Sequence, residues 1–523
     1  MLARVRSAVV LGVDAHPVDV EIDLANGLPS FTTVGLPQNA VKEGRERVTA
    51  AIANSGFEFP LKRITANLAP ADVPKAGSAF DLPIAIGILL ASGQVTLDRP
   101  ALGAQAGFLF GELSLEGGLR PVRGALSLVL CARDLGARWA IVPAANASEA
   151  AMVEGIAVFG AATLDEVVRH LAGRAPLGPA TLTADDPPPI LEADFADVKG
   201  QALAKRALEV AAAGGHNVLM IGPPGGGKTM LARRMPGILP RLTLEEALEV
   251  GKIRSVAGLG GIGTGSSLRP FRAPHHTISD AGLVGGGPLA RPGEVSLAHH
   301  GVLFLDELPE FRRNVLEALR QPLEDGVVTI ARAALSLAYP ARFTLIAAMN
   351  PCPCGFLGDQ RQSCSCRPEA VAKYRARISG PLLDRIDIQL GIGATPWHDL
   401  TDDRLGESST AIRARVASAR GRQLERYRGR AIFANAQLNA RGVRECCQPD
   451  GAGRALLSAA VERLGLSARG YSRVLKVART IADLEGLAEL TVRHLAEAIQ
   501  YRGLDRVTAG PDSRPGGLDI RRA

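Results

Sequence analysis

Three apolar runs in the middle of the chain have the length and uniformity of buried parallel strands. They are "HNVLMIG", which ends at Gly222, "GVLFLDE", which ends at Glu307, and "RFTLIAAMN", which ends at Asn350. Helical patterns separate these runs, and the alternation predicts a doubly wound α/β domain. From about Pro396 the strand pattern stops, and an Ala-, Leu- and Arg-rich helical periodicity predicts a C-terminal helical lid.

The same pattern divides the 523-residue chain into several parts. Residues 175–194 are rich in Pro, Ala and Asp, lack apolar periodicity and indicate a linker. They separate an N-terminal third, residues 1–174, from the α/β core at 195–395 and the helical lid at 396–508. We expect the last stretch, residues 509–523, to be a disordered tail. A chain of this length forms two or three domains, each with its own core.

Composition argues for a cytoplasmic protein that has no membrane partner. The longest apolar stretch, "LPIAIGILLASG" from Leu82, is too short to span a bilayer and contains Pro83, and no small-residue cleavage site follows the N-terminal arginines. In that compartment we expect reduced cysteines. The formal charge of +7 is modest, but residues 412–430 carry seven arginines against one acid. That run is either a solvated helix face or a surface that binds a polyanion.

A phosphate-binding motif follows the first apolar run. "GPPGGGKT" satisfies Gly-x-x-x-x-Gly-Lys-Ser/Thr between a predicted strand and a predicted helix, which is the context that this motif requires. The backbone N–H groups would surround phosphate oxygens, Lys228 would neutralise the β and γ charges, and the Thr229 hydroxyl would bind Mg²⁺. We therefore predict an ATP site formed by Gly222, Pro223, Pro224, Gly225, Gly226, Gly227, Lys228 and Thr229.

Polar residues end the other two apolar runs. Asp306 and Glu307 follow the second run, at the carboxyl end of a predicted strand, where ligands gather in open α/β sheets. Asp306 can hold Mg²⁺, and Glu307 can polarise the attacking water as a general base. Asn350 ends the third run, where its amide can orient that water. These residues complete a predicted site for ATP hydrolysis.

Four of the seven cysteines lie within fifteen residues, in "NPCPCGFLGDQRQSCSC". Disulfides are disfavoured in a reducing compartment, and a redox site would more typically contain a C-x-x-C motif beside a thioredoxin-like pattern. Four thiolates from one short loop can instead complete a tetrahedral Zn²⁺ site, although the C-x-C spacing is tighter than the usual C-x₂-C. We predict a structural zinc insertion at residues 352–366 whose ligands are Cys352, Cys354, Cys364 and Cys366.

The order of these motifs resembles that of an AAA+ ATPase. "RPFRAPHHT", "RPGEVSLAHHGVLFLDELPEF" and "SGPLLDRIDI" are similar to the magnesium-chelatase-like branch, which is related to the MCM helicases. In the N-terminal third, "SFTTVGLPQNAVKEGRERVTAAIANSGFEFP" and "NLAPADVPKAGSAFDLPIAIGIL" resemble the YifB/ComM family. That resemblance covers nearly the whole chain. It implies a homo-hexameric ring that hydrolyses ATP with Mg²⁺ and promotes branch migration of branched or forked DNA during natural transformation or recombination.

The resemblance also assigns roles to arginines. Arg385, in "LLDR", would be the finger that reaches the nucleotide of a neighbouring subunit. Arg469 would be the second sensor, and Arg473, one helical turn later, is the other candidate for that role. The rival function is a chelatase-like motor for metal insertion or protein remodelling. By resemblance, the chelatase ATPase subunit lacks both the N-terminal domain and the cysteine pairs, which argues against this rival.

The resemblance further implies two DNA-contacting segments. A glycine-rich loop between the phosphate loop and Asp306 would point toward the pore of the ring, where its basic residues would meet phosphates. Its candidates are Arg269, Arg272, His275 and His276, and the two histidines have the alternative role of capping a turn. The segment "EDGVVTIARAALSLAYPAR" predicts a β-hairpin, in which Arg332 lies near the tip. An arginine at that position either contacts DNA or serves solubility.

The N-terminal third also resembles the Lon protease domain, an α+β fold shared with the second domain of ribosomal protein S5. The position of the Lon nucleophile is occupied here by Ala79, and Ser78 lies one residue earlier. The position of the Lon lysine is filled by Arg120 or Arg123 in "GGLRPVR", and an arginine cannot act as a general base because it stays protonated. We therefore expect a non-proteolytic domain, with basic residues such as Lys42, Arg45 and Arg47 available for DNA.

Overall fold

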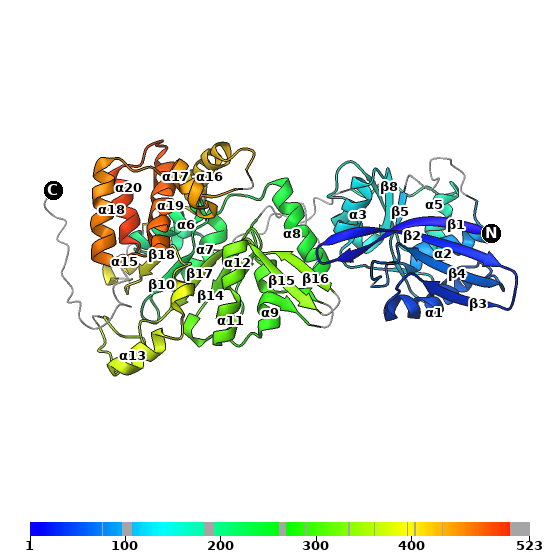
Figure 1. Ribbon diagram of the computed structural model, residues 1–523, viewed down its shortest axis with the longest axis horizontal. Helices are drawn as coiled ribbons and strands as arrows, with labels where there is room; N and C mark the ends of the chain where they lie inside the picture. The colour runs from blue at the N-terminus through cyan, green and yellow to red at the C-terminus, as the bar shows by residue number, and fades with distance from the viewer. Residues whose placement is uncertain are drawn as a thin grey trace.

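The structure of the protein is a computed structural model. It describes residues 1–502 except for short gaps at 76, 97–106, 182–192, 261–267, 288–289, 333–334, 360, 395, 402–403 and 431. Figure 1 shows an elongated molecule, in which the N-terminal region forms one end, a parallel-sheet core lies in the middle and a helical region lies at the other end. The predicted tail and most of the predicted linker lie outside the described residues.

The N-terminal region contains a four-stranded sheet of strand order β1-β2-β4-β3 and a smaller parallel sheet of order β5-β8-β9. The apolar stretch from Leu82 forms α2, which is buried on all sides because it packs on β1, β2 and α1. That packing accounts for its uniform hydrophobicity. The elements are β1 (Leu2–Leu11), β2 (Asp14–Ala25), β3 (Ser30–Val34), α1 (Asn39–Asn54), β4 (Arg63–Ala69), α2 (Asp81–Ala91), β5 (Gly107–Leu109), β6 (Glu112–Leu113), β7 (Leu119–Arg120), α3 (Ala125–Asp134), β8 (Trp139–Pro143), α4 (Ala144–Ala150), β9 (Ala157–Ala161) and α5 (Leu164–Leu171).

The core contains a five-stranded sheet of order β11-β14-β17-β10-β18, and every pair in it is parallel. The three predicted apolar runs form β10, β14 and β17, and the predicted hairpin is formed by β15 and β16. The elements are η2 (Phe195–Asp197), α6 (Ala202–Gly214), β10 (Val218–Ile221), α7 (Lys228–Ile238), α8 (Leu244–Ala257), β11 (Phe271–Arg272), α9 (Asp280–Val284), β12 (Gly285–Gly286), β13 (Arg291–Pro292), α10 (Glu294–Leu297), β14 (Val302–Leu305), η3 (Leu308–Glu310), α11 (Arg313–Ala318), α12 (Arg320–Asp325), β15 (Val327–Arg332), β16 (Leu335–Pro340), β17 (Thr344–Met349), α13 (Pro368–Arg375), α14 (Gly380–Leu383) and β18 (Ile388–Gly391).

The C-terminal region is helical, as predicted. It consists of α15 (Trp397–Thr401), α16 (Ser409–Arg426), η4 (Asn435–Gln437), α17 (Ala440–Cys446), α18 (Gly451–Leu464), α19 (Ala468–Glu485) and α20 (Val492–Gln500). Helices α16 and α19 pack on each other and on α6 of the core. Apolar residues of these helices and of β10 belong to one buried cluster, which includes Val218, Val416 and Val477. The helical region therefore shares a hydrophobic core with the sheet.

Several arginines of the arginine-rich run of α16 bind acceptors on neighbouring helices. The Arg415 Nε donates to Glu209 of α6 at 2.6 Å, and Arg420 donates to a carbonyl oxygen of the same helix at 3.0 Å. The Arg426 Nη1 donates at 3.0 Å to Asp483 of α19, whose side chain is fully buried. These guanidinium groups satisfy buried acceptors between helices. Part of the run therefore links helices, while Arg422, Arg428 and Arg430 are exposed, and binding of a polyanion stays a prediction.

Helix α8 joins the N-terminal region to the core. Lys252 Nζ lies 2.5 Å from Asp14 Oδ1 at the turn between β1 and β2. Beside this ion pair, the buried side chains of Val13, Ile253 and Tyr339 form one apolar cluster. Tyr339 belongs to β16, so the N-terminal region touches both α8 and the β15–β16 hairpin. The two halves of the chain therefore share an apolar junction as well as the segment that links them.

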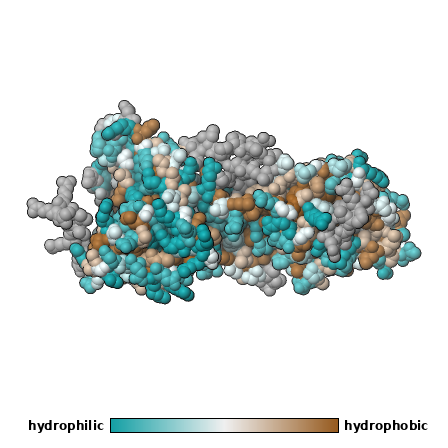
Figure 2. Space-filling view, turned by 90° about the horizontal axis from the view of Figure 1, so that it is seen from above, coloured by the Kyte–Doolittle hydropathy of each residue, from teal (hydrophilic) through white to brown (hydrophobic). Residues whose placement is uncertain are grey.

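The surface is mixed in character. On the face seen in Figure 2, hydrophilic residues predominate at the end formed by the core and the helical region, and hydrophobic residues occur as scattered spots. Within the described part of the chain, every helix is too short or too polar to cross a membrane.

Candidate functional site

The predicted hydrolytic residues meet at the carboxyl edge of the parallel sheet. The phosphate loop follows β10, Asp306 and Glu307 follow β14, and Asn350 follows β17. Thr229 Oγ1 donates to Asp306 Oδ2 at 2.6 Å, so the two predicted Mg²⁺ ligands are in contact. Parallel strands place their carboxyl ends together, which is why three segments far apart in the sequence converge here.

Lys228 is buried at the start of α7 and is held by the loop itself. Its Nζ donates to the carbonyl oxygens of Gly222 and Pro223 at 2.7 and 2.9 Å, and to Asn350 Oδ1 at 3.2 Å. Burial lowers the pKa of Lys228, and the nearby charges of Asp306 and Glu307 oppose that shift. The three acceptors are neutral, and the phosphates of a bound nucleotide would give this ammonium group an anionic partner.

Two glycines of the loop are required by geometry. Gly227 has φ +84°, a conformation that side chains disfavour. A Cβ at Gly222 would lie 2.2 Å from the carbonyl oxygen of Ile392, so any larger residue would displace β18 from β10. The phosphate loop therefore packs directly on the segment that follows β18.

Glu307 has a neighbour that the sequence assigned to another role. Glu307 has φ +52°, a strained backbone for a residue other than glycine, and its side chain is 57% exposed. His276 Nδ1 lies 3.4 Å from Glu307 Oε2. The short strand β11 pairs with β14 and so delivers the histidine to the hydrolytic edge. His275 has its alternative role of capping a turn, since its Nδ1 lies 2.9 Å from Thr277 Oγ1.

Arg269 and Arg272, which we expected to meet DNA, have acidic partners within the chain. Arg269 Nη2 donates to Glu246 Oε2 at 2.8 Å, and its Nε donates to the carbonyl oxygen of Pro240 at 2.7 Å. Arg272 makes two hydrogen bonds to Glu294, at 2.5 and 2.7 Å. A guanidinium group held by two carboxylate oxygens has little charge left for a phosphate. Both arginines are therefore paired within the chain in this structure, and their contact with DNA stays a prediction.

Arg385 lies at the opposite edge of the sheet. It precedes β18, whose amino end lies beside the amino end of β10. Its side chain is only 9% exposed, donates from Nη1 to the carbonyl oxygen of Pro381 at 2.7 Å, and forms an ion pair with Glu324 of α12. Arg469 Nη2 lies 3.8 Å from the other oxygen of Glu324. The two predicted arginines thus share one carboxylate.

A cavity of about 550 Å³ opens beside this pair, and its lining includes Arg385, Glu324 and Arg320. Arg473, the other candidate for the second sensor, is not part of the lining of this cavity. Arg473 forms an ion pair with Asp387 and donates to the carbonyl oxygen of Arg385 at 3.1 Å. Burial of Asp387 alone would raise its pKa, but the charge of Arg473 outweighs that effect, and the pKa of Asp387 is lowered overall. Arg473 is thus committed to a buried ion pair.

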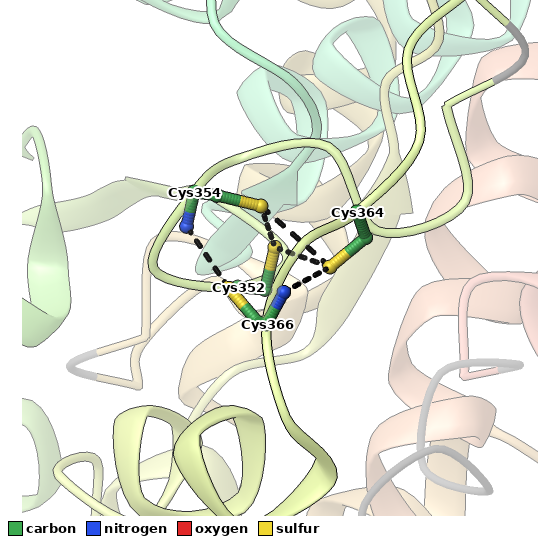
Figure 3. A group of neighbouring side chains, drawn as sticks. All are labelled: Cys352, Cys354, Cys364 and Cys366. Carbon is green, nitrogen blue, oxygen red and sulfur yellow. Dashed lines mark hydrogen bonds between the residues drawn. The ribbon is translucent and has the colours of Figure 1, made fainter.

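The four cysteines of the predicted insertion face one another (Figure 3). Cys352 Sγ lies 3.4 Å from Cys354 Sγ and 3.6 Å from Cys364 Sγ, and the four sulfurs lie within 4.8 Å of one another. A ZnS₄ tetrahedron with Zn–S bonds of about 2.3 Å has sulfur–sulfur edges of about 3.8 Å. The backbone N–H groups of Cys354 and Cys366 also donate to the sulfurs of Cys366 and Cys364, each at 3.4 Å.

Such N–H···S bonds stabilise thiolates around a metal. The distances and the donor set therefore fit Zn²⁺, and Zn²⁺ bound here would crosslink the two C-x-C segments.

A second cluster, formed by Glu249, His299 and His300, does not suit a metal. Glu249 Oε2 lies 2.9 and 2.7 Å from the Nε2 atoms of the two histidines. His299 Nδ1, however, accepts the N–H of Arg342 at 3.0 Å, so in the neutral ring Nε2 carries the proton and has no lone pair for a metal. This cluster instead links α8 by hydrogen bonds to the segment that precedes β14.

In the N-terminal region, Ser78 and Arg120 meet at Glu112. The Ser78 Oγ donates to Glu112 Oε2, and Arg120 Nη1 lies 3.8 Å from Glu112 Oε1. Lys75, which the sequence analysis did not consider, is buried three residues before Ser78 and donates to the carbonyl oxygen of Pro70. Arg47, expected to be available for DNA, is paired with Asp81 at 2.7 Å.

Protein-family models match almost the whole chain. Residues 194–400 match the model described as magnesium chelatase, subunit ChlI, and residues 406–502 match its C-terminal model. Residues 20–146 match a model described as subunit ChlI of Mg-chelatase. Because this last model carries the name of the same subunit, its description alone does not distinguish the N-terminal region from chelatase subunits.

Full-length relatives are more specific. The chain is 46% identical over 507 residues to the uncharacterized protein YifB of Salmonella typhimurium, which covers 97% of this chain and 98% of the relative. It is 46% identical over 512 residues to the competence protein ComM of Haemophilus influenzae, with the same coverage of 97% and 98%. The magnesium-chelatase 67 kDa subunit of Chlorobaculum parvum is 30% identical over 163 residues, which are 30% of this chain and 23% of that protein. The chain therefore belongs to the YifB/ComM family, whose ATPase core is of the magnesium-chelatase ChlI type and implies ATP hydrolysis.

Proposed function

We propose that the protein is an ATP-driven DNA motor that works as a hexameric ring and promotes branch migration. The observation that carries this proposal is the full-length similarity to a protein named for competence, ComM. Uptake of DNA in competence requires that an incoming strand be exchanged into a duplex. A motor that moves the resulting junction would spend ATP at the site described above.

The two edges of the sheet support an assembly in which neighbouring subunits share each nucleotide. Lys228, Asp306 and Glu307 hold and activate the reactants at the carboxyl edge. Arg385 and Arg469 meet at the amino edge, where they are turned away from the nucleotide of their own subunit. They would complete the site of the next subunit by stabilising charge on the γ-phosphate. An isolated subunit would then hydrolyse ATP poorly.

Within each site the protein residues have separate tasks. When bound, Mg²⁺ neutralises phosphate charge, and Thr229 and Asp306 are the residues that would hold it. Glu307 would accept a proton from the attacking water, and Asn350 lies where its amide can orient that water. His276 would keep the Glu307 carboxylate in place.

The DNA-contacting surface in this proposal is the β15–β16 hairpin. Its strands pair from Val327 to Arg332, and Arg332 is the last residue of β15 before the turn. Arg269 and Arg272 are paired with acids of the same chain, which makes the hairpin the more accessible of the two predicted pore segments. The N-terminal region, which we propose to be non-proteolytic and Lon-like, packs beside this hairpin through Tyr339.

A second candidate function is a chelatase-like motor that remodels a protein partner or assists metal insertion. The match of residues 20–146 to a ChlI model favours it. Under either function, we propose that the cysteine cluster is a structural Zn²⁺ centre.

The test measures the ATPase rate with and without forked or four-way DNA, followed by migration of a fluorescent four-way junction. Wild-type protein should be stimulated by DNA and should move the junction, whereas Lys228→Ala should do neither because it cannot bind the phosphates. A preparation that forms rings and hydrolyses ATP, but shows neither DNA stimulation nor strand exchange, would favour the second candidate.

A further inference from the structure

The loop that carries the four cysteines runs along the phosphate loop. The N–H of Gly222 donates to the carbonyl oxygen of Met349 at 3.2 Å, and Lys228 Nζ donates to Asn350 Oδ1 at 3.2 Å. Both acceptors lie within three residues of Cys352, which is fully buried. The first cysteine is thus fixed to a segment that already touches both ends of the phosphate loop.

Gly355 brings the cysteine loop onto the middle of the phosphate loop. It has φ +88°, and its N–H donates to the carbonyl oxygen of Cys352 at 3.0 Å, which closes a turn around Cys354. A Cβ at Gly355 would lie 2.7 Å from Cδ and 2.8 Å from Cγ of Pro224. Cβ atoms do not approach other atoms so closely, so the bare backbone of Gly355 packs against the proline ring.

These contacts form a continuous path from the cysteine sulfurs to the phosphate loop. Two of the four sulfurs, those of Cys352 and Cys354, hold the turn that ends at Gly355. Gly355 supports Pro224, and Pro224 lies in the backbone segment whose N–H groups must converge on the phosphates. Without a metal, little would hold the sulfurs of Cys352, Cys354 and Cys364 at their distances of 3.4–3.6 Å, because S–H groups are weak hydrogen-bond donors.

We propose that metal bound by the four cysteines sets the shape of the phosphate loop, so that the metal-loaded protein binds ATP more tightly than the metal-free protein. Gly355 is the positioning residue that transmits this effect. The inference rests on the proposed Zn²⁺ centre and extends it, because the metal then supports the nucleotide site as well as the insertion itself.

The first test compares two glycines of the same loop. Gly358 also has a positive φ, +80°, but a Cβ there would meet nothing within 4 Å. Gly355→Ala and Gly358→Ala therefore impose a similar backbone strain, and only the first forces Pro224 to move. Both variants should retain zinc, measured by atomic emission. Gly355→Ala should bind a fluorescent ATP analogue with Mg²⁺ about tenfold more weakly than wild type, and Gly358→Ala should bind it normally. Equal affinities in the two variants would overturn the inference.

The second test removes the metal from the full-length protein. Cys364→Ser should lose zinc. In the presence of Mg²⁺ it should bind the ATP analogue about as weakly as Gly355→Ala does. If wild-type protein contains no metal, the proposed zinc centre fails. If wild-type protein contains zinc, and Cys364→Ser loses it without a change in ATP affinity, the zinc centre stands and this inference fails. If Cys364→Ser does not fold, wild-type protein stripped of zinc by a chelator and returned to Mg²⁺ takes its place, and an unchanged ATP affinity in that protein overturns the inference.

Discussion

Replacement of Arg385 should abolish ATP hydrolysis. A neighbouring subunit that retains Arg385 should restore hydrolysis at the site that it completes. Strand β18 has four residues and separates Arg385 from the carboxyl edge. At about 3.3 Å per residue the strand is about 13 Å long, which is about twice the reach of an arginine side chain. Arg385 therefore cannot contact a nucleotide held by the phosphate loop of its own chain. Arg385→Gln should bind ATP normally and hydrolyse it slowly.

The size of the loss follows from the charge that a finger stabilises. Such arginines contribute about 10³–10⁵ to kcat, which corresponds to about 4–7 kcal/mol of transition-state stabilisation. Lys228→Ala should be as inactive, because it cannot hold ATP. In a mixed ring, a site is complete where a subunit with intact Lys228 faces one with intact Arg385. Random mixing of the two variants in equal amounts makes about one quarter of the interfaces complete.

The assay is steady-state ATP hydrolysis by each variant and by their mixture, with ring formation followed by light scattering. The mixture should recover about a quarter of the wild-type rate if the sites act independently. Mixed rings that remain as inactive as the separate variants would refute the assignment to a neighbouring subunit. Wild-type hydrolysis by Arg385→Gln alone would refute any role for Arg385 in the reaction.

Three further outcomes test the site and its supports. Glu307→Gln should bind ATP but lower kcat by about 10²–10⁴, since it removes the general base, and normal turnover would contradict that role. His276→Ala should lower kcat about tenfold with unchanged ATP binding, because Glu307 loses its neighbour, whereas His275→Ala should leave kcat unchanged. Burial lowers the pKa of His299 from 6.5 to about 4, so the unfolded chain binds the extra proton between these values. Resistance to urea should therefore fall as pH decreases from 6.5 to 4, by up to about 1.4 kcal/mol per pH unit from this group, and His299→Asn should show a shallower dependence.

Local sequence signals predicted the parts of the site that depend on local structure. The phosphate loop, the Asp306–Glu307 pair and Asn350 each follow an apolar run, so the ends of β10, β14 and β17 could be located before the fold was known. The cysteine cluster was equally local. The cysteines are brought together by their spacing in one loop, whereas the three hydrolytic segments meet because parallel strands place their carboxyl ends at one edge.

The contacts that the sequence did not predict involve partners far along the chain. Arg415 is paired with Glu209, 206 residues earlier, and no helical periodicity reveals that partner. His276 reaches Glu307 only because the two-residue strand β11 pairs with β14. A strand that short leaves no apolar pattern to recognise. Charge runs and histidine pairs therefore indicate that a residue has a partner, but not which one.

The apolar junction at α8 changes where the chain can be divided. Residues 175–194 are the obvious place for a cut, yet a fragment that begins there would expose Ile253 and Tyr339, which Val13 covers in the intact protein. It would also remove the aspartate that pairs with Lys252. The fragment would expose a new apolar surface at the base of the β15–β16 hairpin. Self-association of such a truncated ATPase would then report the exposed apolar surface rather than the proposed ring.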